Sequence, residues 1–272
     1  MGMGDIMKKL VFFDIDGTLV DYPHGLYTIS EQTKNSLDEL KKEGHSVLLA
    51  TGRCKCFILD EVMKYPFSGY VTCNGGYVEY QGREIYKNIV PAKAIEVTHN
   101  VCKENDWLYY FEGNDQIYVL DKHDPKHIQF RDAWGMKEKT ICDQFDFDEI
   151  ETYIGMIVVN DKKDIPLMVE TLSPYFEVQR HQSDFSFDLT LKGESKGASI
   201  KRLADSLQVD IKDTIAFGDG RNDIEMLEMV GLGIAMGNAV EEAKAVSDMV
   251  TDSVLEEGIT TALRKISLIK NR

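Results

Sequence analysis

The feature that most constrains the fold is a short apolar run that ends in two aspartates and a glycine. Residues Leu10–Phe13 are all apolar, and Asp14-Ile15-Asp16-Gly17-Thr18 follows them directly. Such a run is typical of a strand buried on both faces of a parallel sheet. Side chains at i and i+2 of a strand point the same way, and open α/β sheets bind ligands at the carboxyl ends of their strands. We therefore expect Asp14 and Asp16 to project together into a ligand site.

Two carboxylates this close need a cation. At about 4 Å and an effective dielectric constant of ~20 their repulsion costs roughly 4 kcal/mol. Mg²⁺ favours oxygen ligands together with a substrate phosphate, and Gly17 permits a sharp turn in which backbone N–H groups face a ligand. The stretch predicts a metal-assisted carboxylate nucleophile. An acidic turn without a ligand is the alternative interpretation.

Three further motifs follow in order along the chain. Ala50-Thr51-Gly52-Arg53 comes after the apolar run Val47–Leu49. The others are Ser195-Lys196-Gly197 and, after Thr214–Phe217, Gly218-Asp219-Gly220-Arg221-Asn222-Asp223. Taken singly, each has a simpler interpretation: a hydroxyl or amide can cap a turn or helix, a lysine can be solvated, and acidic residues suit a helix N-terminus.

Together the four motifs resemble the signature of the haloacid dehalogenase-like phosphohydrolases. The long insertion between the second and third motifs, with Ala235-Met236-Gly237-Asn238-Ala239 later on, is similar to the Cof-type subfamily. The resemblance implies an α/β fold, in which a Rossmann-like parallel-sheet core carries an inserted α+β cap domain. We expect the catalytic core at residues 1–83 and 189–272 and the cap, which sets substrate specificity, at residues 84–188. No cap residue matches the family individually.

The resemblance also implies roles for the motif residues. Asp14 is expected to attack phosphorus, and Asp16 to act as general acid and base. Thr51 and Lys196, also counted as catalytic, are expected to hold the phosphoryl oxygens. The expected cofactor is Mg²⁺, held by Asp14, Asp16 (through its backbone carbonyl) and Asp219, with Asp223 and Asn222 supporting the ion directly or through water. The expected substrate-binding residues are Thr51, Gly52, Arg53, Lys196 and Asn222.

The function implied is a Mg²⁺-dependent phosphatase that hydrolyses small phosphate monoesters, such as sugar phosphates or phosphorylated cofactors, through an aspartyl-phosphate. One alternative is a phosphomutase, which needs cap cations to turn a bisphosphate; the cap sequence offers Arg131, Arg180 and His181. The other is a non-catalytic ligand-binding member, which needs a damaged set of catalytic residues. Neither the physiological substrate nor the oligomeric state has a signal in the sequence.

The composition of the chain argues against several other classes of protein. The formal net charge of −15 argues against a nucleic-acid surface. The sequence has no run of about 18 apolar residues, so it predicts no membrane-spanning helix. Five cysteines without framework spacing indicate reduced thiols in a cytoplasmic protein. The pair Cys54-Lys55-Cys56 lacks two further ligands for zinc, so we interpret both as ordinary thiols. Met1–Met7 is expected to be a disordered leader.

Local patterns at three further places predict the backbone conformation. Asn74 and Asn238 each stand next to a glycine and are expected to support left-handed turns. Residues Cys56 to Lys64 are expected to be helical. One last helix is expected to present an apolar face to the core, with Leu255, Ile259, Leu263, Ile266 and Ile269 at helical spacing.

Overall fold

The structure is a computed structural model, and residues 8–133, 136–180 and 184–270 are described here. Met1–Met7, Trp134 and His181 lie outside these ranges. The chain forms two compact units. Unit 1 comprises the described parts of Met1–Gly52, Ile58–Tyr86 and Ser195–Arg272, and unit 2 comprises Arg53–Phe57 and Lys87–Glu194.

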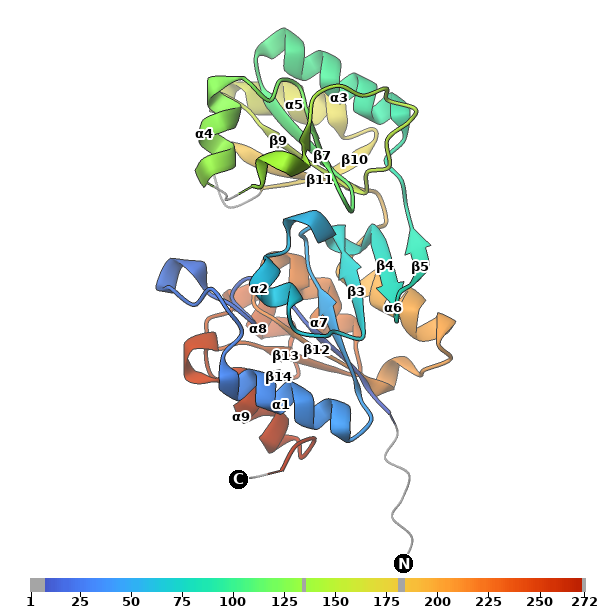
Figure 1. Ribbon diagram of the computed structural model, residues 1–272, viewed down its shortest axis with the longest axis vertical. Coiled ribbons are helices and arrows are strands. Elements are labelled where there is room, and N and C mark those ends of the chain that lie inside the picture. The colour runs from blue at the N-terminus through green and yellow to red at the C-terminus, as the bar shows by residue number, and fades with distance from the viewer. Residues whose placement is uncertain (1–7, 134–135, 181–183, 271–272) are drawn as a thin grey trace, which may run out of the picture. The chain divides into compact units, whose positions relative to one another are not determined.

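Unit 1 contains an eight-stranded sheet in the order β14-β13-β12-β1-β2-β3-β4-β5 (Figure 1). Strands β14 to β3 pair in parallel, and β4 returns antiparallel to β3. The mixed α/β class with a mainly parallel sheet, predicted from the sequence, is confirmed. The strands are β1 (Leu10–Phe13), β2 (Ser46–Ala50), β3 (Gly69–Thr72), β4 (Tyr77–Tyr80), β5 (Arg83–Lys87), β12 (Thr214–Gly218), β13 (Leu232–Ala235) and β14 (Met249–Val250).

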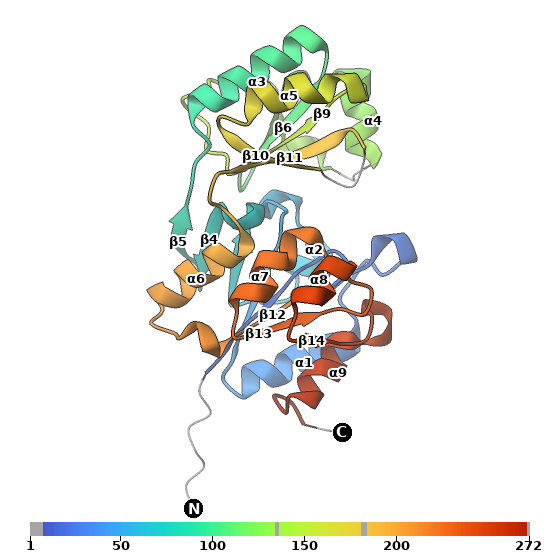
Figure 2. The same cartoon turned by 180° about the vertical axis from the view of Figure 1, so that it is seen from behind.

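Helices cover both faces of this sheet, which is why β1 is apolar throughout (Figures 1 and 2). Val11 and Phe13 pack in one buried cluster with residues of α1, α2 and α9, whereas Leu10 and Phe12 pack in another with residues of α6, α7 and α8. The helices are α1 (Glu31–Lys42), α2 (Asp60–Met63), α6 (Lys196–Ser206), α7 (Ile224–Met229), α8 (Glu241–Val246) and α9 (Gly258–Lys265).

Two expected helices are shorter than the sequence suggested. The segment expected from Leu255 to Ile269 is interrupted at Glu257, whose φ of 61° is left-handed, so α9 begins only at Gly258. Leu255 therefore leaves the apolar face and is 52% exposed, while Ile259 and Leu263 are buried as expected. The helix expected from Cys56 to Lys64 divides into a 3-10 turn and α2.

Unit 2 has its own six-stranded sheet in the order β10-β11-β9-β6-β7-β8. Helices α3 and α5 pack in one buried cluster against residues of β6, β9 and β11; α4 and β8 were not foreseen. The elements are β6 (Leu108–Glu112), β7 (Ile117–Val119), β8 (Ile141–Cys142), β9 (Ile154–Val158), β10 (Phe176–Arg180), β11 (Ser186–Leu191), α3 (Ala92–Asn105), α4 (Pro125–Ala133) and α5 (Ile165–Leu172).

The limits of unit 2 differ from the expected 84–188. Arg83–Lys87 forms strand β5 beside β4, so the chain stays with the first sheet until Tyr86. At the return, the Asn88 side chain donates to Glu194 at 2.8 Å, which ties Glu194 to unit 2. Short 3-10 turns link the elements: η1 (Tyr22–His24), η2 (Lys55–Phe57), η3 (Cys73–Gly75), η4 (Glu138–Thr140), η5 (Lys162–Asp164), η6 (Ile211–Asp213), η7 (Arg221–Asp223) and η8 (Val254–Glu256).

Within the described ranges, the helices are all too short or too polar to cross a lipid bilayer.

Candidate active site

The motif loops of unit 1 leave neighbouring strands at the same edge of the sheet. Asp14 follows β1, Thr51 follows β2, and Asp219 follows β12, and β1 pairs in parallel with both of the other strands. The Asp14 N–H donates to the Phe217 carbonyl at 3.0 Å, which fixes the backbone of the first motif against β12. Parallel pairing therefore collects residues that are far apart in the sequence.

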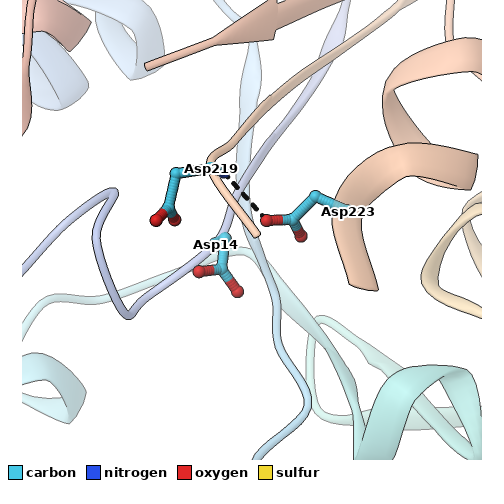
Figure 3. Close-up of side chains that lie close together, drawn as sticks. All are labelled: Asp14, Asp219 and Asp223. Atoms are coloured by element: carbon cyan, nitrogen blue, oxygen red, sulfur yellow. Dashed lines mark hydrogen bonds between the residues drawn. The ribbon is translucent and has the colours of Figure 1, made fainter. Parts of the chain in front are cut away.

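Three carboxylates form the centre of the site (Figure 3). Asp14, Asp219 and Asp223 each offer an oxygen, and these oxygens lie within 4.8 Å of one another. Asp14 and Asp223 are buried and Asp219 is half-buried. Across residues 8–133, 136–180 and 184–270, this is the one group of three acidic, histidine or cysteine side chains close enough to share a metal ion.

Lys196 is the buried cation of this cluster. It is the first residue of α6, whose N-cap Ser195 accepts a hydrogen bond from the Ala198 N–H. Its Nζ lies 2.6 Å from Asp14 Oδ1 and 2.7 Å from Asp223 Oδ1. Burial lowers the pKa of Lys196, but the two carboxylates more than offset this and hold the pKa above its usual range. Lys196 therefore stays charged.

The excess of negative charge in the cluster raises the pKa values of its own carboxyl groups. Burial, together with the charges of Asp223, Asp219 and Asp16, raises the pKa of Asp14 well above its usual range, although Lys196 opposes the shift. Burial and the Asp223 carboxylate raise the pKa of Asp219 to about 7. One lysine thus does not neutralise the cluster, and a further cation would relieve it.

Asp223 also holds the fourth motif in shape. Its Oδ2 accepts the backbone N–H groups of Asp219 and Gly220, each at 2.9 Å, and the first of these bonds is drawn in Figure 3. Its Oδ1 accepts from Lys196. Both oxygens of Asp223 therefore already have a donor, while its position at the end of η7 fixes the direction of the loop that presents Asp219.

The first motif needs glycine at position 17. Gly17 has a φ of +85°, and a Cβ there would lie 2.1 Å from Asp219 Oδ2. The Thr18 hydroxyl donates to Asp219 Oδ1 at 3.2 Å. Asn238 links this loop to the segment that begins at Val254. Its side-chain amide donates to the Gly17 carbonyl at 2.8 Å, and its side-chain carbonyl accepts the Val254 N–H at 2.9 Å.

The second motif is fixed by backbone bonds and by an asparagine pair. Thr51 is buried, its N–H donates to Val71, and its carbonyl accepts the Asn74 N–H at 3.2 Å. Asn74 adopts the expected left-handed conformation with a φ of 49°, whereas the same expectation is wrong for Asn238, whose φ is not positive. Its Oδ1 accepts the Asn222 amide at 3.3 Å, and a Cβ at Gly52 would lie only 2.9 Å from it. Gly52, Asn74 and Asn222 thus lie together.

Two of the predicted site residues, Asp16 and Arg53, belong to different units. Asp16 is half-buried, and its charge acts on both Asp14 and Asp219. Arg53 belongs to unit 2, where its guanidinium donates to the Phe57 carbonyl at 3.1 Å and lies over the Phe57 ring. A role of Arg53 toward a phosphoryl group stays a prediction.

Thr18, Asn74 and Asn238 make contacts at the site that are outside the sequence-based predictions. The position of the Thr18 hydroxyl directly after the acidic stretch could have predicted that it contacts the site. The two asparagines were assigned only to turns, since nothing in their local sequence indicates a partner more than a hundred residues away.

The donor set fits Mg²⁺. Carboxylate oxygens are the ligands that this ion prefers, and the raised pKa values of Asp14 and Asp219 reflect a negative charge that a divalent cation would compensate. Asp14 and Asp219 are the side chains best suited to hold the ion, because Asp223 already accepts from three donors.

Comparison with known proteins defines the class. The family model for haloacid dehalogenase-like hydrolases matches residues 11–263. The chain belongs to this family, which confirms the resemblance seen in its motifs.

Individual relatives agree with this assignment. YkrA of Bacillus subtilis (strain 168), which is named as a phosphatase, is 32% identical over 263 residues, covering 97% of this chain and 99% of its own. A hypothetical protein from Geobacillus kaustophilus HTA426 superimposes with a TM-score of 0.86 at 32% identity, covering 96% of this chain and all of that one. A subclass IIB sugar phosphatase of the same superfamily has a TM-score of 0.81 at 27% identity, with 96% and 100% covered. These names agree with the predicted phosphoric monoester hydrolase.

Proposed function

We propose that this chain is a Mg²⁺-dependent phosphatase that hydrolyses a small phosphate monoester, such as a sugar phosphate, with Asp14 as nucleophile. The observation that carries the proposal is the buried contact of 2.6 Å between Lys196 Nζ and Asp14 Oδ1, inside a cluster with Asp219 and Asp223. A carboxylate held this way is fixed in position before substrate arrives, and phosphoryl transfer depends mainly on positioning and charge stabilisation.

Asp14 and Asp219 would hold Mg²⁺, with the Asp16 carbonyl as a further ligand. The bound ion supplies charge neutralisation at the nucleophile and at the phosphoryl oxygens. Asp223 acts on the ion indirectly, because it orients Lys196 and the backbone of Asp219. Asp223→Asn should therefore disturb Lys196 and the loop as well as the affinity for the ion.

In the first chemical step, an Asp14 carboxylate oxygen attacks phosphorus. The bond from phosphorus to the ester oxygen breaks, and the leaving alcohol takes a proton from the Asp16 carboxyl. Lys196 and Thr51 hold the phosphoryl oxygens while charge moves onto the leaving oxygen. The product of this step is an aspartyl-phosphate on Asp14 and the free alcohol.

In the second step, water attacks phosphorus and gives its proton to the Asp16 carboxylate. The bond between phosphorus and the Asp14 oxygen breaks, so inorganic phosphate leaves and the Asp14 carboxylate is restored. Asp16 thus ends as a carboxyl group, ready for the next ester.

We assign substrate choice to unit 2, as a cap domain, because the family resemblance implies a specificity function for the inserted segment. Arg131 and Arg180, the two arginines that the phosphomutase alternative invokes, give it no support. Arg131 pairs with Asp132 at 2.8 Å, and Arg180 pairs with Asp184 at 3.1 Å, so carboxylates of unit 2 already compensate both charges.

A phosphate-release screen tests the proposal. The purified protein is incubated at fixed Mg²⁺ with a panel of small phosphorylated metabolites, and also with a folded phosphoprotein. We expect clear release from at least one sugar phosphate without any bisphosphate activator, and little from the phosphoprotein. Release only in the presence of a bisphosphate would favour a phosphomutase, and a complete absence of release would contradict the proposal.

A further inference from the structure

Two thiols in unit 2 lie in contact with each other. The Sγ atoms of Cys54 and Cys56 are 3.2 Å apart. Cys54 is fully buried, whereas Cys56 is only partly buried and can be reached from solvent. The proposed phosphatase chemistry uses neither thiol.

The backbone suits a bond between these sulfurs. Residues two apart in sequence have Cα atoms separated by no more than about 7 Å, and disulfides take Cα separations of about 4.4–6.8 Å. Cys56 lies in the tight turn η2, Lys55–Phe57, which brings its side chain back toward Cys54. Little backbone movement is therefore needed to join the two sulfurs.

The surroundings favour a redox pair over a metal site. Zinc sites take about four ligands, and no third acidic, histidine or cysteine ligand lies within sharing distance of these two thiols among the residues that the structure describes. Glu112 of β6 accepts hydrogen bonds from the Cys54 thiol and N–H, and burial raises its pKa to about 7 against their effect. Its carboxylate can accept the Cys54 proton when that thiol reacts.

We propose that Cys54 and Cys56 form a reversible dithiol/disulfide site that responds to peroxide. The Cys56 thiolate attacks hydrogen peroxide, the O–O bond breaks, and a sulfenic acid and hydroxide are formed. The Cys54 sulfur then attacks the Cys56 sulfur, and hydroxide leaves as water with the proton from Cys54. Overall, two thiols and one peroxide give one disulfide and two waters.

Oxidation changes how the segment Arg53–Phe57 is attached to β6. In the reduced form the Cys56 thiol donates to the Gly113 carbonyl at 3.5 Å and the Cys54 thiol to the Glu112 carboxylate. A disulfide has no hydrogen to donate, so both bonds are lost. Because Thr51 and Gly52 directly precede this segment, the disulfide lowers phosphatase turnover; this part of the inference rests on the proposed function.

The test uses the full chain titrated with hydrogen peroxide. Remaining thiols are alkylated after unfolding, and intact mass counts them. We expect the loss of two alkylatable thiols together, reversed by a dithiol reductant, with the linkage mapped to peptides containing Cys54 and Cys56. Turnover should fall in step by roughly tenfold, as expected for the loss of two weak hydrogen bonds.

Three variants separate the outcomes. Cys54→Ser and Cys56→Ser should each abolish the paired loss, whereas Cys142→Ser should keep it. Cys142 is the matched control because its half-buried thiol also donates to a backbone carbonyl, that of Gln144, at 3.3 Å.

Paired loss that persists in Cys54→Ser, or thiols that oxidise one by one, would overturn the redox site. A disulfide that leaves turnover unchanged would overturn its effect on activity. Absence of turnover in both redox states, with the disulfide formed, would contradict the proposed phosphatase while supporting the redox site.

Discussion

The Lys196 ammonium group lies 2.6 Å from a carboxylate oxygen of Asp14, although 182 positions separate the two residues in the sequence. Both side chains are buried, so neither charge has bulk water to stabilise it. Asp14 and Lys196 depend on each other, and this contact makes their substitution informative about both stability and turnover.

Lys196→Met should lower both the free energy of unfolding and the rate of phosphate release. Removing one partner of a buried ion pair leaves the carboxylates of Asp14 and Asp223 uncompensated, at a cost of about 3–5 kcal/mol in the free energy of unfolding. We expect phosphate release to fall by about 100-fold or more, as for the loss of one donor to developing charge. Urea unfolding followed by circular dichroism and a phosphate-release assay measure the two effects.

Lys201→Met is the matched control for this variant. Lys201 lies on the same helix and pairs with Asp205 at 2.8 Å, but at an exposed position. It should change stability by less than about 1 kcal/mol, because exposed ion pairs contribute little. Full turnover in Lys196→Met would show that Lys196 is not needed to hold the phosphoryl group.

Binding of Mg²⁺ should weaken as the solution becomes more acidic. The pKa of Asp219 is raised to about 7, and that of Asp14 is raised as well. Protons therefore compete with the ion below about pH 7, and the Mg²⁺ concentration for half-maximal thermal stabilisation should be higher at pH 6 than at pH 8. Asp219→Asn should lose most of this stabilisation. Equal half-saturation at both pH values would contradict the carboxylate site.

Asp16→Asn should affect esters unequally. An alkyl phosphate has a poor leaving group that needs a proton from Asp16, whereas p-nitrophenolate leaves with little protonation. We expect the larger loss of kcat on the alkyl ester, measured by phosphate release from both substrates under the same conditions. Equal losses on the two esters would indicate that Asp16 is chiefly structural.

Glu112 should make the stability of unit 2 depend on pH. Burial raises its pKa in the folded protein to about 7 from the ordinary value of 4.5. An acid with a raised folded pKa stabilises the fold fully below its unfolded pKa, and that contribution is lost as pH rises through the folded pKa. The free energy of unfolding should therefore fall by up to about 3 kcal/mol between pH 4.5 and 7.

Tryptophan fluorescence can follow this loss, because Trp107 is buried in the cluster between α3, α5 and the unit 2 sheet. In Glu112→Gln the dependence on pH over this window should be much reduced. Glu104→Gln, at an exposed position of α3, should retain it. A Glu112→Gln protein with the original pH dependence would assign the effect to another group.

The sequence predicted the parallel core and the residues that gather at the site, because each motif follows an apolar strand or starts a helix. It could not predict that Asp223 is shared between Lys196 and the backbone of Asp219, since that arrangement depends on the three-dimensional path of η7. Arg53 shows the limit of adjacency: it follows Gly52 directly, yet it packs on Phe57 in unit 2. Leu255 shows the limit of periodicity, because helical spacing continues across Glu257 although the helix does not.

The central claim is that Asp14 is the nucleophile, and phosphate release by Asp14→Asn tests it most directly. The amide has nearly the same shape as the carboxylate but is a poor nucleophile, so the protein should fold and turnover should be abolished. The measurement is release from the best ester of the metabolite screen, at saturating Mg²⁺, with circular dichroism to verify folding. Turnover below about one thousandth of the original rate is the predicted result, a loss of about 4 kcal/mol in transition-state stabilisation. A folded Asp14→Asn protein with near-original kcat would contradict the covalent mechanism.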